Sequence, residues 1–363
     1  MDALNTTGQR LFLASGDEPN LAMSPLSIGL AFGMLHAGAT GRVREAIERL
    51  YPFPPDAPAA LESLVTKVSR DGDDLPAVTV ANGAFLAEEF SLIADYAATL
   101  RDHFAALIES LPMRSDPEGS RAAIDEWISD RTRGLIERIM PEDLPHEDTR
   151  LILVNTVYFK AKWEQPFGEG SASPRPFLLA DGTEASADLM FEGGAFAFAR
   201  SDDWDAVRLP YEGDLEMLVV IPQAGRFAEV QERLAGSLID DVDSALTPGQ
   251  VLVSLPKFTA EAKLDLDHVI TRGLGIHDLF GVEGLDGIGP RLAVDAAIHA
   301  AKVIVDEEGT EAAAATVIAV RAMSMPIYDA EIIADRPFLY AIRDTATKAI
   351  LFLGRYTDPR ASN

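Results

Sequence analysis

The first part of the chain carries apolar residues at helical spacing. Ser24 is a favourable N-cap and Pro25 suits the first helical position, so together they predict the start of a helix that ends near Gly38. Its apolar stripe has the spacing of one helix face and comprises Ile28, Leu30, Ala31, Met34 and Leu35. A long amphipathic helix is also predicted over 118–139, where the apolar positions are Ile124, Trp127, Ile128, Leu135, Ile136 and Ile139.

Strand-like patterns dominate the middle and the end of the chain. The side chains of residues 78–85 alternate in the pattern of a strand. Residues 151–163 are rich in Val, Ile, Tyr and Phe, which is also typical of strands. Residues 206–221 predict two strands joined by a tight turn, and 337–356 predict a hairpin that turns at 343–348. Helices come early and strands later, without a repeated strand–helix–strand order. The pattern therefore predicts an α+β fold.

Composition is that of a globular protein with a sizeable core. The chain has 363 residues, 47% hydrophobic and 25% charged, and this length leaves the number of domains open. The net charge of −27 repels a phosphate backbone and anionic lipid, so we expect no nucleic acid and no membrane as partner. No apolar run reaches the roughly 18 residues that span a bilayer, and the first residues do not resemble a signal peptide. We expect a soluble chain, cytoplasmic as given or secreted if a signal was removed.

Residue usage also argues against most kinds of catalysis. The chain has no cysteine, which excludes thiol catalysis and thiolate metal sites. No two of its six histidines have the spacing of a helical zinc site, and neither a nucleophile elbow nor a phosphate-binding glycine loop occurs. We therefore expect no metal, no cofactor and no enzyme activity. Asparagine and glutamine number five each, which fits a heat-adapted, thermostable protein and a GC-rich genome equally well.

An unusual stretch begins at Glu307. It follows a strand-like run at 301–305 and contains four consecutive alanines after Glu311. Helix propensity favours an alanine-rich helix there. Small side chains also suit a loop that later becomes a strand, and 316–320 has clear β propensity. The residues of this stretch alone leave both interpretations open.

The start of this stretch resembles the hinge of inhibitory serpins, and the hinge residues are Glu307, Glu308, Gly309, Thr310, Glu311, Ala312, Ala313, Ala314 and Ala315. Five more segments look like serpin segments in the family's order, namely 23–28, 154–163, 255–258, 274–280 and the closing run 335–340 with 350–355. Six matches in one order extend over nearly the whole chain. The chain is therefore identified as a member of the serpin family.

The resemblance implies the serpin fold, with about nine helices around three β-sheets, a large central sheet and an exposed reactive-centre loop at about 307–326. It also implies a single serpin domain over 1–363 and a monomer. The implied function is inhibition of serine endopeptidases as a suicide substrate, in which the cleaved loop inserts into the central sheet and traps a covalent acyl-enzyme. The alternative is a noninhibitory serpin, a carrier or chaperone, whose hinge usually carries bulky or charged residues.

The family pattern also implies which bond is cut. Counting about seventeen residues from Glu307 gives an antitrypsin-like Met323–Ser324 bond, to within roughly two residues, and Arg321 is the rival position. An unbranched apolar side chain such as Met323 suits chymotrypsin-like or elastase-like pockets. A trypsin-like pocket needs a cation instead.

Other residues are implied to control insertion. Thr310 and alternate residues after it are expected to share the buried face of the inserted strand, and Gly309 is expected to supply a turn. Trp163 is expected at the breach, the top of the sheet where insertion begins. A polar sheet-opening cluster is expected beneath the sheet, and it comprises Ser24, Ser27, Asn155 and His299.

Overall fold

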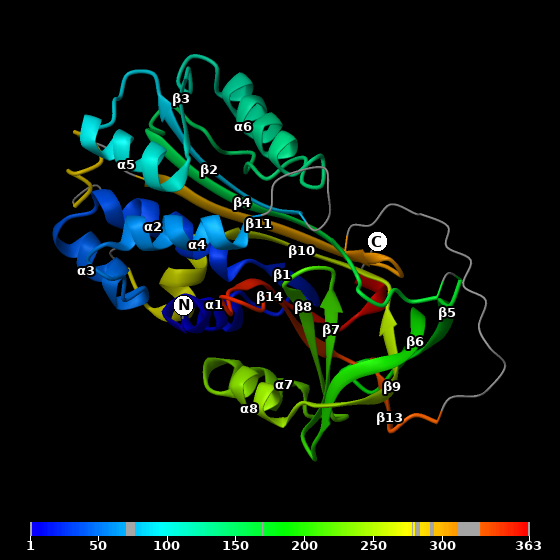
Figure 1. Ribbon diagram of the computed structural model, residues 1–363. Helices are drawn as coiled ribbons and strands as arrows, with labels where there is room; N and C mark the ends of the chain where they lie inside the picture. The colour runs from blue at the N-terminus through cyan, green and yellow to red at the C-terminus, as the bar shows by residue number, and fades with distance from the viewer. Residues whose placement is uncertain are drawn as a thin grey trace.

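The computed structural model describes residues 2–69, 77–168, 170–277, 279, 284–290, 294–310 and 327–361. Its strands form two hydrogen-bonded sheets that lie side by side, with helices on both faces of the first (Figure 1). The predicted α+β fold is confirmed, because helices dominate the first third of the chain and strands the rest. No helix of the described residues is long and apolar enough to cross a membrane.

The first sheet, called the central sheet here, has six strands in the order β10-β11-β12-β4-β2-β3. Most neighbours are antiparallel, but β11 pairs with β4 in parallel, and β2 with β3. Most residues of β4 are buried, as expected for a strand between two covered faces. The strands of this sheet are β2 (Ala77–Ala87), β3 (Leu107–Leu111), β4 (Leu151–Lys162), β10 (Phe258–Asp265), β11 (Val294–Val305) and β12 (Gly309–Thr310).

The second sheet has nine strands in the order β1-β15-β14-β8-β7-β6-β9-β13, with β5 also paired to β6. Three sheets were expected in all. The long strand β6 pairs with β9 along most of its length and with β7 at its end, so it joins two groups of strands into one ladder. The strands are β1 (Asn20–Met23), β5 (Ser173–Leu178), β6 (Glu184–Arg200), β7 (Trp204–Tyr211), β8 (Leu215–Pro222), β9 (Thr247–Pro256), β13 (Ala330–Ile333), β14 (Phe338–Asp344) and β15 (Ile350–Tyr356).

Nine α-helical segments occur among the described residues, in agreement with the expected number. Helices α1 to α4 lie on one face of the central sheet and α6 lies on the other (Figure 1). The helices are α1 (Asp2–Ala14), α2 (Pro25–Gly38), α3 (Gly41–Leu50), α4 (Ala57–Val68), α5 (Ala94–Phe104), α6 (Pro117–Arg131), α7 (Phe227–Glu232), α8 (Leu238–Ala245) and the short α9 (Leu266–His268).

Helix α2 starts and ends where the sequence predicts. The Ser24 side chain accepts a hydrogen bond from the Ser27 amide, and Pro25 occupies the first helical position. Nearly every residue of α2 is buried, because the helix is covered by α1, α4 and α5 and packs on β4. Helix α2 therefore holds Ser24 and Ser27 beneath the middle of the central sheet.

The helix predicted over 118–139 is shorter than expected. Helix α6 ends at Arg131, and the chain turns through positive φ at Arg133 and Gly134. Ile136 and Ile139 nevertheless remain buried in the cluster that packs α6 onto the central sheet. Ile136 and Ile139 have helical spacing in the sequence because both are buried against the same face of the sheet. The backbone at these positions is nevertheless not helical.

Candidate functional site

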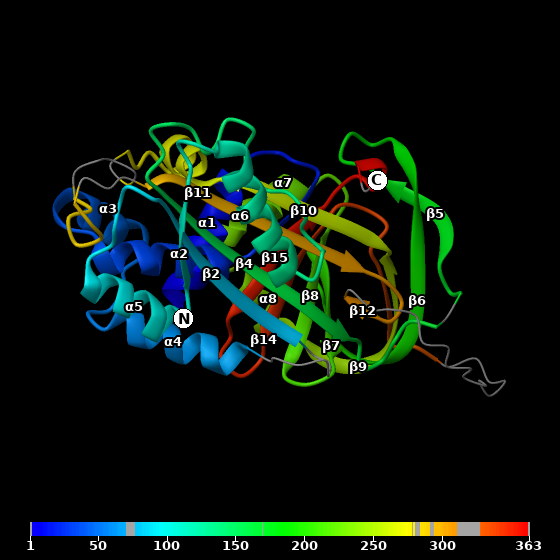
Figure 2. The same ribbon diagram turned by 90° about the horizontal axis from the view of Figure 1, so that it is seen from above.

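The two ends of the segment 311–326 are attached to different sheets. Thr310 belongs to β12 in the central sheet (Figure 2), and Ala330 begins β13 in the second sheet (Figure 1). The candidate scissile residues Met323 and Ser324, the rival Arg321 and the hinge residues 311–315 lie outside the described residues. The structure therefore describes the attachments of this segment and the sheet beside it.

Strand β12 lies between β11 and β4 at one end of the central sheet. Gly309 pairs with Lys162 and Thr310 with Ala161, both on β4, while Thr310 also pairs with Val305 on β11. A methyl group built on Gly309 would lie 2.1 Å from the Ala161 carbonyl oxygen. Glycine is needed there because two backbones approach closely. A left-handed turn is not the reason, since the φ of Gly309 is not positive.

An aromatic cluster holds Thr310 in place. The Tyr211 hydroxyl and Thr310 Oγ1 share a hydrogen bond of 2.6 Å. The rings of Tyr211 and Trp163 are stacked, with centroids 4.1 Å apart, and Phe167 packs edge-on against Trp163. Thr310 is only 1% exposed, so its side chain is buried beside Tyr211. Burial raises the pKa of Tyr211 well above its usual range, which keeps this hydroxyl protonated.

The residues just before β12 form a tight, hydrogen-bonded turn. Asp306 Oδ1 accepts from the amides of Glu308 and Gly309 at 2.9 and 3.1 Å. Trp163 donates its indole N–H to the Asp306 carbonyl at 3.0 Å and its backbone N–H to the Glu308 carbonyl at 2.9 Å. Lys257 forms an ion pair with Glu307 at 2.8 Å. The carbonyls, carboxylates and amides of this turn thus bind the residue after β4, the residue before β10 and the turn itself.

These contacts change the expected start of the exposed loop. The loop was expected to begin at about Glu307, but Glu307 and Glu308 are half-buried, and Gly309 and Thr310 are buried in the sheet. The reason is that the end of β4 pairs with Gly309 and Thr310, and the backbone N–H of Trp163 donates to the Glu308 carbonyl. The segment that was expected to form the hinge therefore starts as part of the central sheet.

The expected polar cluster is also assembled, and it is buried. The Ser24 amide donates to His299 Nε2 at 3.0 Å, and the Ser27 hydroxyl donates to Asn155 Oδ1. Asn155 in turn donates from its side-chain amide to Asn82 Oδ1, and Asn82 donates to the Phe104 carbonyl at 2.6 Å. The cluster therefore joins the start of α2 and the end of α5 to three strands of the central sheet, β2, β4 and β11.

His299 is a neutral hydrogen-bond acceptor in this cluster. Its Nε2 accepts from the Ser24 amide, so the ring proton is on Nδ1, which lies 3.5 Å from Ser27 Oγ. The residue is 1% exposed, and this burial lowers its pKa to about 3. A second ring proton would point at a backbone N–H. The arrangement can therefore position strands, but it offers no proton donor or acceptor to an external substrate.

The cluster lies where the direct pairing of β4 and β11 stops. That pairing runs from Leu151 to Asn155 on β4, and its last pair is Asn155 with His299. Beyond it, residues 156–160 of β4 and 300–304 of β11 are not paired with each other, until β12 pairs with both strands at the far end. Strands β4 and β11 are thus paired with each other on one side of the cluster and unpaired on the other.

The other end of the segment is anchored by Asp329. Its backbone amide donates to the Gln250 carbonyl at 2.7 Å, and its carboxylate accepts from the Gln250 amide at 2.8 Å. Tyr328 packs against Gly193 on β6, where a methyl group would lie 2.0 Å from the tyrosine hydroxyl oxygen. Strand β13 then pairs with β9 in parallel. Both ends are therefore held by backbone pairing and by an adjacent side chain.

Two residues of the site were missed by sequence reasoning. Asn82 interrupts the apolar alternation of its strand, and a polar residue in a strand buried on both faces was a usable signal. Tyr211 carried no such signal, because it meets Thr310 across 99 residues of sequence. No group of three or more histidine and acidic side chains that could hold a metal occurs in the part of the chain that the structure describes.

Comparison with known proteins agrees with this architecture. The serpin (serine protease inhibitor) family model matches residues 2–359. A serpin-like protein of Thermococcus kodakarensis is 32% identical over 95% of this chain and 82% of its own length. A serine protease inhibitor of Cyanea capillata is 32% identical over 96% of this chain and 95% of its own length. The crystal structure of native protease nexin-1 with heparin has a TM-score of 0.86 at 28% identity and covers 99% of both chains.

The chain therefore belongs to the serpin family, and its fold is the serpin fold. Serpins are generally protease inhibitors that form complexes with serine proteases, and they are not catalytic enzymes.

Proposed function

We propose that this serpin is an inhibitor of serine endopeptidases that acts once, as a suicide substrate. The observation that carries the proposal is β12: the hinge already pairs with β4 and β11 at the mouth of the unpaired stretch between them. A chain end that continues from Thr310 can extend this strand without first opening the sheet. We further propose that residues 1–363 act as one domain and one monomer.

The proposed reaction starts as ordinary proteolysis. The protease serine attacks the carbonyl carbon of Met323, the peptide bond to Ser324 breaks, and the new amine of Ser324 takes up a proton. An ester then joins Met323 to the protease serine. Water would normally cleave this ester at about 1 to 1000 per second, so insertion has to be faster than hydrolysis. The trapped product is the covalent acyl-enzyme.

The unpaired edges of β4 and β11 would supply hydrogen-bond partners to an inserted strand. About fourteen inserted residues at about 3.3 Å each span about 46 Å, enough to carry a tethered protease to the far end of the sheet. Thr310 already faces the interior, so Ala312, Ala314 and Thr316 would follow on the same side. Small side chains there lower the barrier to passing between two strands.

Two groups are proposed to control this movement. Trp163 and Tyr211 hold the breach, because they bind the turn and Thr310 where the strand begins. The polar cluster holds the paired part of the sheet, because two of its members, Asn155 and His299, are the last residues at which β4 and β11 pair directly. The cluster comprises Ser24, Ser27, Asn155 and His299. Insertion beyond five residues of β4 has to separate Asn155 from His299.

Met323 supports a chymotrypsin-like or elastase-like target, because its side chain is unbranched and apolar. Arg321 would instead suit a trypsin-like target. Mass spectrometry of the peptide released by each protease distinguishes the two positions. A new amino terminus at Ser324 supports Met323, and one at Ala322 supports Arg321.

The noninhibitory alternative, a carrier or chaperone, is tested by incubation with chymotrypsin. An inhibitor gives a covalent complex that survives denaturing electrophoresis, whereas a carrier is only cleaved. Thr310→Arg is the matched variant, because a charged side chain in place of the buried Thr310 should convert an inhibitor into a substrate. Cleavage of the unchanged chain at Met323 without any complex would contradict the proposal.

A further inference from the structure

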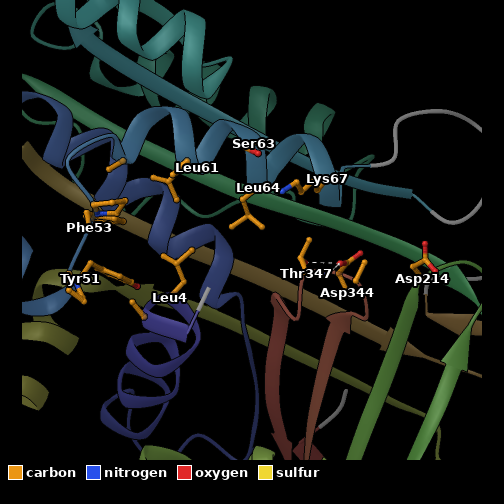
Figure 3. A pocket seen from close by; sticks show the side chains of 16 residues that line it. Leu4, Tyr51, Phe53, Leu61, Ser63, Leu64, Lys67, Asp214, Asp344 and Thr347 are labelled. Atoms are coloured by element: carbon orange, nitrogen blue, oxygen red, sulfur yellow. Dashed lines mark hydrogen bonds between the residues drawn. The ribbon is translucent and has the colours of Figure 1, made fainter.

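Large apolar side chains of the described residues are mostly kept away from water. Even at a surface cavity of about 650 Å³ between α1, α4 and the turn from β14 to β15, the walls are buried, and Leu4, Leu61 and Leu64 are 8%, 4% and 8% exposed (Figure 3). Two large apolar side chains in the described part of the chain are exposed, Ile93 at 39% and Ile327 at 93%. Ile327 thus presents nearly its whole side chain to water.

The backbone that carries Ile327 is held by the residues that follow it. Tyr328 packs against Gly193 on β6. The Asp329 amide donates to the Gln250 carbonyl at 2.7 Å, and the Asp329 carboxylate accepts from the Gln250 amide at 2.8 Å. Much of the entropy cost of fixing Ile327 is therefore met before any partner binds.

Ile327 is also close in sequence to the proposed reactive bond. It is the fourth residue after the Met323–Ser324 bond, and four extended residues span at most about 13 Å. A standard protein–protein interface covers about 800 Å² on each partner, which is a circle of about 16 Å radius. A protease bound at this bond can therefore cover Ile327. Single apolar residues on a surface are common, but this one lies where a partner is expected.

Cleavage separates Ile327 from the trapped acyl-enzyme. The ester would join the protease to Met323, which is continuous with β12 in the central sheet, whereas Ile327 stays attached to β13 in the second sheet. When the strand extends from Thr310, the protease moves away from Ile327. A contact with Ile327 can therefore strengthen the complex before cleavage, but it cannot affect the later competition between hydrolysis and insertion.

From this placement we propose that Ile327 is a specificity-determining residue that binds an apolar depression of the target protease, beside its active site on the side of the leaving amine. This proposal rests on the proposed function. A protease with a charged group at that place is disfavoured, because the charge would lose water without gaining a partner. The contact slows dissociation of the first complex, so acylation competes better with dissociation.

The second-order rate constant for inhibition of chymotrypsin tests the proposal. Ile327→Ser should lower it by about tenfold, the low end of what full burial of an isoleucine side chain contributes. The number of inhibitor molecules consumed per trapped protease should not change, because that ratio is set after cleavage. Ile327→Val should keep most of the rate constant. Equal rate constants for the unchanged chain and Ile327→Ser would overturn the proposal.

Ile93→Ser is the matched control. Ile93 is the other exposed isoleucine, and it is the N-cap of α5, which lies at the opposite end of the molecule from β13 (Figure 1). Serine is a favoured N-cap, so the helix is retained. The rate constant should stay unchanged. A similar loss in both serine variants would mean that surface apolarity in general sets the rate, and would contradict a contact at Ile327.

The role of the anchor is tested by repeating the change in Asp329→Ala. This background loses the carboxylate that accepts from the Gln250 amide. Ile327→Ser should then lower the rate constant by only about threefold or less, because the two residues are coupled. An undiminished effect in this background would show that the anchor does not position Ile327.

The same variants separate this proposal from the proposed function. If chymotrypsin only cleaves the unchanged chain, the inhibitor proposal fails, but kcat/KM for that cleavage should still be about tenfold lower in Ile327→Ser. If a covalent complex forms equally fast with and without Ile327, the inhibitor proposal stands and the role of Ile327 is wrong. Absence of both cleavage and complex would overturn both.

Discussion

Asn155 and His299 form the last directly paired residues of β4 and β11, and both belong to the buried polar cluster. One position in the sheet thus marks the end of strand pairing and holds the hydrogen bonds to α2. A hydrogen-bond network buried at that point is costly to leave partly satisfied. Any process that separates the two strands further has to break it.

The protonation state of His299 should therefore affect stability. Its pKa is about 3 when folded and about 6.5 in an unfolded chain. Above pH 6.5 both states are neutral at this residue, so the stability is fully present. Below pH 6.5 the unfolded chain binds a proton at His299 that the folded chain does not bind. The free energy of unfolding therefore falls by about 1.4 kcal/mol per pH unit until about pH 3.

The prediction is checked by urea unfolding at several pH values, with His299→Asn as the comparison. The variant should lack this part of the pH dependence. If the variant does not fold, the His299 imidazole signal can be followed by NMR in the unchanged chain. A His299 signal that titrates near pH 6.5 would show that the folded state accepts the proton and would contradict the prediction.

The contact between Tyr211 and Thr310 gives a second prediction. Tyr211→Phe removes the hydrogen bond of 2.6 Å but keeps the ring stacked on Trp163. The free energy of unfolding should fall by about 1 kcal/mol. Hydrogen exchange of a peptide containing Gly309 and Thr310 should become faster, because β12 loses the hydrogen bond between Thr310 and Tyr211.

Tyr340→Phe is the matched control for this change. The Tyr340 hydroxyl is buried but has no hydrogen-bond partner among the described residues. Its removal should leave exchange at Gly309 and Thr310 unchanged and should not lower stability. Equal exchange rates in the two variants would show that Tyr211 does not hold β12.

Local patterns predicted the elements better than their contacts. The start of α2 was predictable because Ser24 and Pro25 are signals that act within one turn. The hairpin of β14 and β15 was predictable because its strands are adjacent in sequence. The end of α6 was not, because apolar spacing continues to Ile139 after the backbone has turned at Gly134.

The site combines residues that no local pattern connects. Resemblance to serpins led to Ser24, Ser27, Asn155 and His299, which the structure brings together. Asn82 completes their hydrogen bonds from another strand, across 73 residues of sequence. The pairing of Gly309 and Thr310 within the sheet could not be predicted either, because it depends on Trp163 and on the close approach of Gly309 to Ala161.

A buried charge network gives the third prediction. Arg343 on β14 is 2% exposed and forms ion pairs with Glu216 on β8 and Asp243 on α8. Arg343→Met leaves Glu216 buried, with Arg208 as its remaining partner at 3.2 Å. The free energy of unfolding near neutral pH should therefore fall by about 3 kcal/mol, at the low end of the cost of breaking a buried pair. Urea unfolding measures the loss.

Arg200→Met is the control, because Arg200 is an exposed partner of Asp205 and its loss should cost about 0–1 kcal/mol. Acid should reduce the difference between the two variants. Burial alone would raise the pKa of Asp243, but Arg343 and Arg208 outweigh it and lower the pKa below 3.8. This contribution is present above pH 3.8 and is lost as the pH falls through the lowered pKa. A difference between the two variants that persists unchanged below pH 3.8 would mean that Arg343 stabilises the fold by packing and not by charge.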